Sequence, residues 1–303
     1  MKKNNKLENL YKQSVINING EICDAKDAKI SIFDRGFLYG DSIYEVAYSL
    51  DSNLIFFEDH IDRLYQSARF LNMQIYYSRD EIIRESIKTL QTSKISDAYI
   101  RIILTRGETE ITLDPSSSHK NNLVIITKPK PIHPEIFYTN GIKLSIVSIL
   151  RNDARSTNPS AKSGNYLNNV LAVSEAKKLQ FDDALMENRN GFITEGSSFN
   201  IWFIKNGIIH TPPAESGLLK GITREKLIEL CNKNKIPLKI ENFTANELKQ
   251  AQTVFITSST RGIMPVSIID EHKFNIDFNF IERLQKLYKE LIKKSIENET
   301  YKY

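Results

Sequence analysis

The chain has 303 residues, 41% hydrophobic and 26% charged, which is typical of a globular protein with one large or two medium domains. Its 41 basic and 37 acidic residues are interleaved, and a net charge of +4 without a basic stripe argues against nucleic acid as a partner. The polar start, the lack of a long apolar run and the presence of only Cys23 and Cys231 predict a cytoplasmic protein with no membrane partner.

Short strands joined by tight turns are expected at the beginning of the chain. Residues 14–18 and 21–24 flank Asn19-Gly20, a dipeptide that favours a two-residue hairpin turn. Residues 42–50 and 54–57 have the composition of a second hairpin.

Two helices and two more strands are predicted next. From Glu58 the apolar residues recur at helical spacing, and Ser78 with Glu81 forms a capping-box pattern that opens a second helix. Residues 98–105 and 123–127 are rich in β-branched side chains and predict buried strands. The first part of the chain is therefore predicted to be an α+β arrangement, with helices attached to an antiparallel sheet.

Three prolines between residues 129 and 134 indicate a linker, because proline disrupts both helices and sheets. We predict a smaller N-terminal α/β domain over residues 1–130, an interdomain linker over 131–140 and a larger C-terminal α/β domain over 141–303. Within the last of these, strands are expected at 142–150, 184–187, around Ile193, and at 199–204, 208–211, 238–241 and 253–257. Helices are expected at 166–179, 223–234, 245–249 and 278–296.

Lys162 and Glu195 are the first candidates for chemistry. Lys162 lies in a loop of small residues just before a predicted helix, where a desolvated amine could act as a nucleophile; a solvated surface lysine is the alternative. Glu195 follows a short strand and precedes small residues, so its carboxylate could pair with a pyridine nitrogen; the alternative is a turn glutamate in water.

Three further segments could bind an anion. Residues 221–223 open a helix whose free N–H groups suit a phosphate, although a plain Thr N-cap explains them too. The hydroxyl-rich turn 257–262 suits phosphate or carboxylate, or is an ordinary polar turn. Arg63 follows Ile61 by two positions, hence off the apolar face of its helix, where it could reach a phosphate or pair with Asp59.

Taken together and in this order, these segments resemble the class IV aminotransferases, a family that holds branched-chain aminotransferases, D-amino-acid aminotransferases and aminodeoxychorismate lyases. The resemblance extends from about residue 15 to residue 270. It implies the fold-type IV architecture of the D-amino acid aminotransferase type, with two α/β domains, pyridoxal 5'-phosphate as cofactor and a homodimer or higher homo-oligomer. The segments that carry it are 34–41, 59–64, 105–107, 162–166, 195–200, 221–224 and 257–266.

The resemblance also implies a role for each matching residue. Lys162 would carry the cofactor as a Schiff base and shuttle the proton, Glu195 would pair with the pyridine nitrogen, and Tyr166 would bind the phenolic oxygen. Arg63, Ile222, Thr223 and Ser259 would hold the phosphate, Leu219 would pack under the ring, and Tyr39, Tyr44, Tyr99, Arg101, Thr260 and Arg261 would line the substrate pocket. No metal site is assigned.

Residues 98–101, 113–115 and 162–166 resemble the branched-chain enzymes most. They imply a ping-pong transamination between a branched-chain L-amino acid and 2-oxoglutarate, in branched-chain amino acid biosynthesis.

Residues 34–36 and 44–46 resemble instead the D-amino-acid enzymes, such as D-alanine aminotransferase. A lyase that releases pyruvate from aminodeoxychorismate and a non-enzymatic binding protein are further alternatives. Where the branched-chain enzymes carry two small residues, this chain has Thr260-Arg261, so Arg261 is a candidate to bind a carboxylate.

Overall fold

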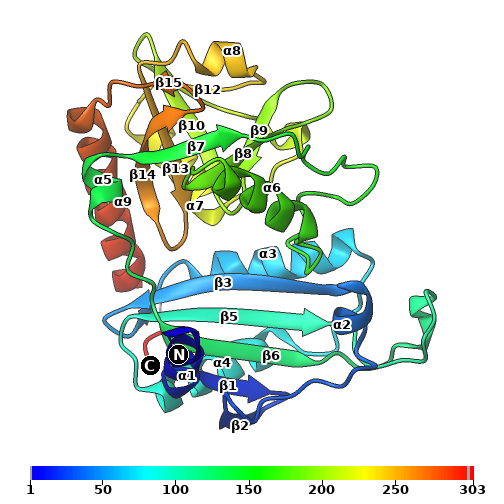
Figure 1. Cartoon of the computed structure of the whole chain (residues 1–303). Coiled ribbons are helices and arrows are strands. Elements are labelled where there is room, and N and C mark those ends of the chain that lie inside the picture. The colour runs from blue at the N-terminus through cyan, green and yellow to red at the C-terminus, as the bar shows by residue number, and fades with distance from the viewer. Residues whose placement is uncertain (1, 299–300) are drawn as a thin grey trace. The chain divides into compact units, whose positions relative to one another are not determined.

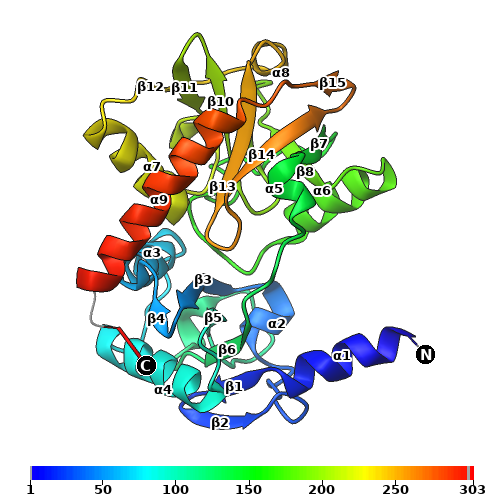
Figure 2. The same ribbon diagram turned by 90° about the vertical axis from the view of Figure 1, so that its left-hand side faces the viewer.

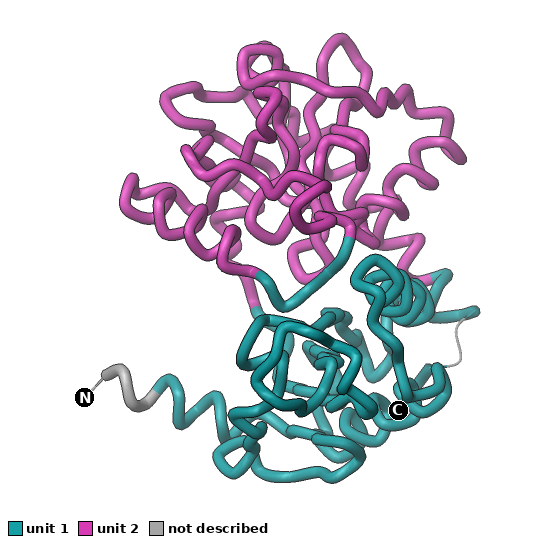
Figure 3. The backbone as a smooth tube through the Cα atoms, turned by 90° about the vertical axis from the view of Figure 1, so that its right-hand side faces the viewer, with its two compact units in different colours: residues 1–131, 161–165, 294–303 teal, residues 132–160, 166–293 magenta. Residues whose placement is uncertain are grey.

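A computed structural model describes residues 2–298 and 301–303, without the side chains of residues 2–5 (Figures 1 and 2). The chain divides into two compact units (Figure 3). Unit 1 runs up to Pro131 and also contains residues 161–165 and 294–303, whereas unit 2 contains residues 132–160 and 166–293. Nothing in the sequence indicated that residues 161–165 and 294–303 belong to unit 1. The domain limits predicted at residues 130 and 141 do not include these two segments, and they stay a prediction.

Unit 1 is built on a six-stranded antiparallel sheet with the strand order β2-β1-β6-β5-β3-β4 (Figures 1 and 2). The first predicted hairpin is confirmed, because Asn19 and Gly20 form its turn with φ values of 54° and 92°. These values are left-handed, and asparagine and glycine adopt them at low cost. The strands are β1 Val15–Ile18, β2 Glu21–Asp24, β3 Ser42–Leu50, β4 Asn53–Leu54, β5 Ala98–Thr105 and β6 Leu123–Pro129.

Two helices, α3 and α4, cover one face of this sheet. Alternate residues of the strands, such as Ile43, Ile100 and Ile125, pack in one core with the apolar faces of these helices. The capping box of Ser78 and Glu81 is present as predicted. The helices of unit 1 are α1 Lys2–Lys12, α2 Arg35–Tyr39, α3 Phe57–Phe70 and α4 Arg79–Ser93. The predicted α+β arrangement of this part is therefore confirmed.

Two predictions for unit 1 were wrong. The strand expected over residues 54–57 ends at Leu54, because Phe56 takes a left-handed φ of 51° and Phe57 begins α3. The prolines were expected to lie outside the sheet, yet Pro129 is the last residue of β6 and pairs with Ala98. The missing N–H costs little there, since β1 pairs with β6 only as far as Thr127.

Unit 2 contains a nine-stranded mixed sheet with the order β12-β11-β10-β13-β14-β7-β8-β9, and β15 pairs with β14. An additional pairing of Glu195 with Asn200 joins β9 to β10 and closes part of the sheet into a barrel. The strands are β7 Ile142–Ile146, β8 Asp183–Glu187, β9 Ile193–Gly196, β10 Asn200–Lys205, β11 Ile208–Thr211, β12 Leu238–Ile240, β13 Thr253–Ser258, β14 Gly262–Ile269 and β15 His272–Lys273.

The remaining α-helices lie along the chain before, between and after these strands. They are α5 Ile136–Thr139, α6 Leu167–Lys178, α7 Ile222–Lys233, α8 Ala245–Leu248 and α9 Phe278–Asn298. Strand β7 is shorter than predicted, because Glu175 binds the N–H and hydroxyl of Ser148 in place of a neighbouring strand. In the part of the chain that the structure describes, we find no helix that combines the length and the hydropathy needed to cross a membrane.

Candidate active site

The main chain of Lys162 is fixed within unit 1. Tyr44 of β3 donates its N–H to the carbonyl oxygen of Lys162 at 2.9 Å, and the N–H of Lys162 donates to Ser67 Oγ of α3 at 3.0 Å. Gly164 continues along β3, donating to the carbonyl oxygen of Ser42 at 2.7 Å. A Cβ atom on Gly164 would lie 2.1 Å from Ser42 Oγ, so the close approach requires glycine. The backbone at Lys162 is therefore built into the edge of the sheet.

The structure brings Lys162 together with two residues predicted for the substrate pocket. Lys162 Nζ lies 4.5 Å from the centre of the Tyr44 ring, and the guanidinium carbon of Arg101 lies 4.0 Å from the same ring. Tyr44 is only 5% exposed, and a cation near an aromatic face is attracted to it. A primary amine, an aromatic wall and a guanidinium group thus meet within one unit.

Arg63 has different surroundings from those predicted. It was expected off the apolar face and paired with Asp59 or a phosphate, but its side chain is buried and forms a two-pronged ion pair with Glu45. Arg63 Nε and Nη2 donate to the two carboxylate oxygens of Glu45 at 2.7 and 2.8 Å. The second oxygen also bonds His60 Nδ1 at 2.8 Å. The pair with Glu45 was not foreseen because this partner lies on β3, outside the helix that was considered. That Arg63 holds a phosphate stays a prediction.

The charges of this buried cluster are balanced. Burial raises the pKa of Glu45, but the charge and hydrogen bonds of Arg63 and the hydrogen bond of His60 outweigh it and lower the pKa to about 2. Burial lowers the pKa of His60 below its ordinary value in spite of Glu45. At neutral pH Glu45 is therefore ionised, and a neutral His60 donates from Nδ1.

Tyr99 and Arg101 line a groove of about 450 Å³ on the face of the unit 1 sheet that α3 and α4 leave uncovered. Its floor is apolar, with Val124 and Ile126 of β6 among its residues. Tyr39 ends α2 and packs against Arg35, whose guanidinium carbon lies 4.9 Å from its ring centre.

In unit 2, Glu195 lies at the point where β9 and β10 pair, and its carboxylate is almost fully buried. Arg151 Nη2 donates to its Oε1 at 2.9 Å, and the N–H of Leu219 donates to its Oε2 at 3.1 Å. Asn200 Nδ2 approaches the same oxygen at 3.4 Å and donates to the carbonyl oxygen of Leu219 at 2.9 Å. A guanidinium group at this distance favours the ionised carboxylate.

The start of α7 has the features of an anion site. Gly221 precedes the helix without any side chain that caps it, and Ile222 and Thr223 in the first turn are buried. Helix N–H groups at such a start attract phosphate. Among the described residues, the buried Arg151 Nε also has no hydrogen-bond partner. A helix start without a capping side chain suits a phosphate, and the predicted cofactor carries one.

The other predicted residues of unit 2 lie at the ends of its elements. Tyr166 precedes the first turn of α6, and Ser259 and Thr260 form the half-buried turn between β13 and β14. Arg261 Nη2 pairs with Asp183 at 3.0 Å, and its guanidinium carbon lies 5.4 Å from the ring centre of Phe199. That Arg261 binds a substrate carboxylate stays a prediction.

Sequence reasoning missed Arg151 and Ser67 and gave no role to Glu45 or His60. The spacing of Ser67, one helical turn after Arg63, was a usable signal that both lie on one face of the helix. Arg151 had none, because it reaches Glu195 only through the folding of unit 2.

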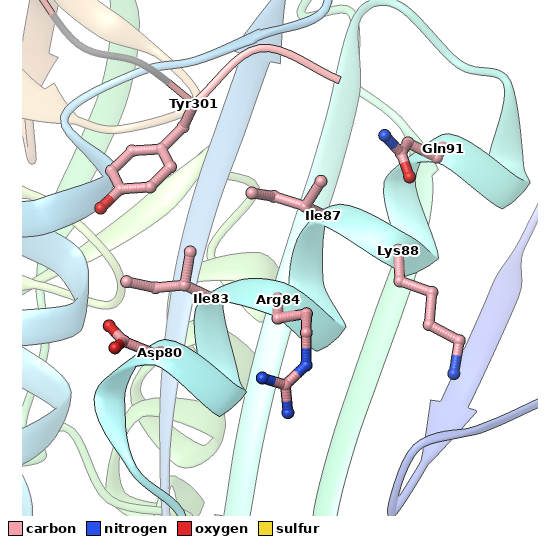
Figure 4. Close-up of a pocket in the computed structure, with 7 residues that line it drawn as sticks. All are labelled: Asp80, Ile83, Arg84, Ile87, Lys88, Gln91 and Tyr301. Carbon is pink, nitrogen blue, oxygen red and sulfur yellow. The ribbon is translucent and has the colours of Figure 1, made fainter.

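A second groove, of about 360 Å³, lies beside α4 between Ile83, Ile87 and the ring of Tyr301 (Figure 4). Its lining includes none of the residues predicted for the site.

Comparison with known proteins gives consistent matches. Residues 42–269 match the model of the family described as amino-transferase class IV. The chain is 38% identical over 260 residues to the "Putative branched-chain-amino-acid aminotransferase" of Methanocaldococcus jannaschii, covering 86% of this chain and 89% of that protein. It is 32% identical over 256 residues to the D-alanine aminotransferase of Staphylococcus epidermidis, covering 84% and 88%. The solved structure of the Escherichia coli branched-chain amino acid aminotransferase superposes with a TM-score of 0.87, at 26% identity and coverage of 92% and 95%.

The buried cluster around Glu45 makes the first testable prediction. Glu45→Gln removes the carboxylate charge that accepts two hydrogen bonds from the buried Arg63, so we expect the free energy of unfolding at neutral pH to fall by about 3–5 kcal/mol. Because the pKa of Glu45 is lowered from 4.5 to about 2, its stabilisation is complete above pH 4.5 and is lost as the pH falls toward 2. Urea unfolding should therefore show the gap between variant and wild type narrowing from about pH 5 to about pH 3.

The matched control is Glu110→Gln, which changes an exposed carboxylate of the same unit and should alter stability by less than about 0.5 kcal/mol. A Glu45→Gln protein as stable as this control would show that the ion pair is not formed.

Proposed function

This chain belongs to the class IV aminotransferases, and from that membership we propose that it exchanges an amino group between a branched-chain L-amino acid and 2-oxoglutarate. The fold expected from the resemblance, that of the fold-type IV enzymes, is confirmed by the match to solved structures. The enzyme is a transaminase, and its substrates are amino acids and 2-oxo acids. The finer choice of substrates is our proposal.

Class IV aminotransferases use pyridoxal 5'-phosphate, and so does this enzyme. When bound, this group supplies an aldehyde that joins to amines and a ring that accepts the electron pair released at the Cα atom of the amino acid. We propose that Lys162 Nζ holds the cofactor before the substrate binds. Lys162 Nζ would then take the proton from the substrate Cα atom and return it to the cofactor carbon that carried the aldehyde. The amino acid and the oxo acid then react in turn, which gives ping-pong kinetics.

Each of the remaining residues has a proposed part in holding the cofactor. Glu195, kept ionised by Arg151, would hold the proton on the pyridine nitrogen, and Tyr166 would donate to the phenolic oxygen. Leu219 would pack under the ring, in a position that its hydrogen bond to Glu195 stabilises. The phosphate would be held by Arg63, Ile222, Thr223 and Ser259.

The observation that carries the choice of substrates is that the Tyr44 ring lies close to both Lys162 Nζ and the guanidinium group of Arg101. An aromatic wall beside the reacting amine favours an apolar side chain such as that of leucine. A guanidinium group on the same ring favours a substrate with a second carboxylate, as 2-oxoglutarate has. Tyr39, Tyr99, Thr260 and Arg261 would complete the pocket. One site can then accept both partners of the exchange in turn.

The similarity to a D-alanine aminotransferase supports a second candidate, a transaminase for D-alanine. Mixing the purified enzyme with one amino acid at a time separates the candidates, because a substrate converts the cofactor and removes its visible absorption band. We expect L-leucine to bleach the band at least about 10-fold faster than D-alanine, and L-glutamate to bleach it too. Faster bleaching by D-alanine would overturn the proposal. Release of pyruvate from aminodeoxychorismate would instead identify a lyase.

Lys162→Ala should reduce turnover about 10³-fold or more, because it removes the group that takes up and returns the proton. The control is Lys178→Ala, which removes an exposed amine at the end of α6 and should leave kcat unchanged. Steady-state assays of both proteins, each with cofactor in excess, make the comparison. Turnover of Lys162→Ala at the level of the control would contradict the role of Lys162.

We further propose that the enzyme is a homodimer, or a higher oligomer built from it, in the reducing cytoplasm that its two free cysteines fit. Phe37, Ile111 and Leu113 are among the large apolar side chains that unit 1 exposes, at 71%, 72% and 80%. Their backbones are held together by Arg35, which pairs with Asp41 and donates to the carbonyl oxygens of residues 112 and 113. An ordered apolar surface of this kind is typical of a protein interface.

Charged residues at this surface should separate the subunits. We expect the double variant Ile111→Asp, Leu113→Asp to sediment as a monomer at concentrations where the wild type sediments as a dimer, because each aspartate would be buried without a partner. Leu179→Asp, at an exposed leucine in unit 2, should stay dimeric. A wild type that sediments as a monomer would refute the proposal.

A further inference from the structure

We propose that Ser67 is a positioning residue for Lys162, and that its hydroxyl fixes the reactive amine relative to Arg63 on the same helix. The inference rests on the proposed function, in which Lys162 holds the cofactor and Arg63 holds its phosphate. Ser67 itself touches neither substrate nor cofactor in this account.

The hydroxyl of Ser67 uses both of its hydrogen-bonding capacities. Ser67 lies on α3, is fully buried, and donates to the carbonyl oxygen of Arg63 at 2.9 Å. This donation directs the hydroxyl hydrogen along the helix and leaves a lone pair of Oγ for the N–H of Lys162 at 3.0 Å. The two bonds therefore assign one orientation to the hydroxyl and connect Lys162 directly to the main chain of Arg63.

Lys162 has a second anchor on the opposite side. Its carbonyl oxygen accepts from the N–H of Tyr44 on β3 at 2.9 Å, and residue 163 forms a bridge with Ile43. With both anchors the backbone at Lys162 is held between a helix and a strand of unit 1. Without the Ser67 hydroxyl only the strand side remains, and the N–H of Lys162 loses its acceptor in a place where Ser67 is shut off from water.

Helix α3 therefore sets the distance between two groups of the proposed site. Ser67 and Arg63 are one helical turn apart, so the helix sets the separation between the backbone of the cofactor-bearing lysine and the guanidinium group of Arg63. The Glu45 carboxylate fixes the orientation of that guanidinium group in turn. A main-chain shift of about 1 Å at a reacting group can lower a rate about 100-fold. Loss of the Ser67 hydroxyl should thus act on the rate of the chemical step.

The first test measures the bond itself and needs no cofactor. Amide hydrogen exchange of Lys162 in the cofactor-free protein should be about 10-fold faster in Ser67→Ala than in the wild type, and intermediate in Ser67→Cys, whose thiol is a weaker acceptor of similar shape. The matched control is Ser86→Ala. Ser86 is also fully buried and makes the same bond to its own helix, donating to the carbonyl oxygen of Ile82 at 2.7 Å, but it lies on α4.

The second test measures the reaction. With a wild type that bleaches with an amino acid, Ser67→Ala should bleach about 10-fold slower at saturating substrate with an unchanged KM, Ser67→Cys should recover part of the rate, and Ser86→Ala should match the wild type. Exchange and bleaching in Ser67→Ala equal to those of Ser86→Ala would overturn the positioning role. A wild type that bleaches with no amino acid would instead refute the proposed function, while the exchange result would still decide whether Ser67 holds Lys162.

Discussion

The hydrogen bonds on the two sides of Lys162 are the constraint on which the rest of the site depends. A lysine in a loop of small residues would normally carry its amine on a mobile stem in water, with many conformations. Here the N–H is held by Ser67 of α3 and the carbonyl oxygen by Tyr44 of β3, so the side chain leaves a fixed point and passes over the Tyr44 ring. The conformational cost of fixing this backbone is met during folding, so the Lys162 side chain starts from one position.

Both units bury a carboxylate against an arginine, and the two pairs differ in their hydrogen bonds and in the residues that they hold. In unit 1, Glu45 takes two hydrogen bonds from Arg63 and a third from His60, which orients the guanidinium group and balances its charge. In unit 2, Arg151 Nη2 pairs with the buried carboxylate of Glu195 where β9 meets β10. Removing one partner of such a buried pair is costly because it leaves the other charge uncompensated, so each pair also holds its two side chains in one geometry.

Local patterns predicted the elements well where one short segment decides the structure. Asn19-Gly20 and the Ser78–Glu81 capping box were identified because the turn and the cap depend on neighbouring residues alone. Strand β14 was not predicted. It contains Pro265, and its parallel pairing with β7 begins only at Val266, after the proline. The closure of the barrel by Glu195 and Asn200 was equally invisible, because it depends on the order of strands across all of unit 2.

The residues of the candidate site were likewise predictable where a local motif marks them and unpredictable where a distant segment supplies them. The motifs around Lys162, Glu195 and Gly221 could be identified from the sequence because their order along the chain resembles one family. Their partners could not, because Ser67, Arg151 and Glu45 each reach a site residue from a distant segment. Sequence patterns reveal which residue carries the chemistry more readily than which residue holds it in place.

The central claim is that the amine of Lys162, fixed between α3 and β3, is the one that joins the aldehyde of the cofactor. Borohydride makes the bond between an amine and pyridoxal phosphate permanent, so the reduced enzyme can be digested and its peptides weighed. We expect the added mass of the phosphopyridoxyl group on the peptide that contains Lys162 and on no other. The same mass on another lysine, or on none, would contradict the account.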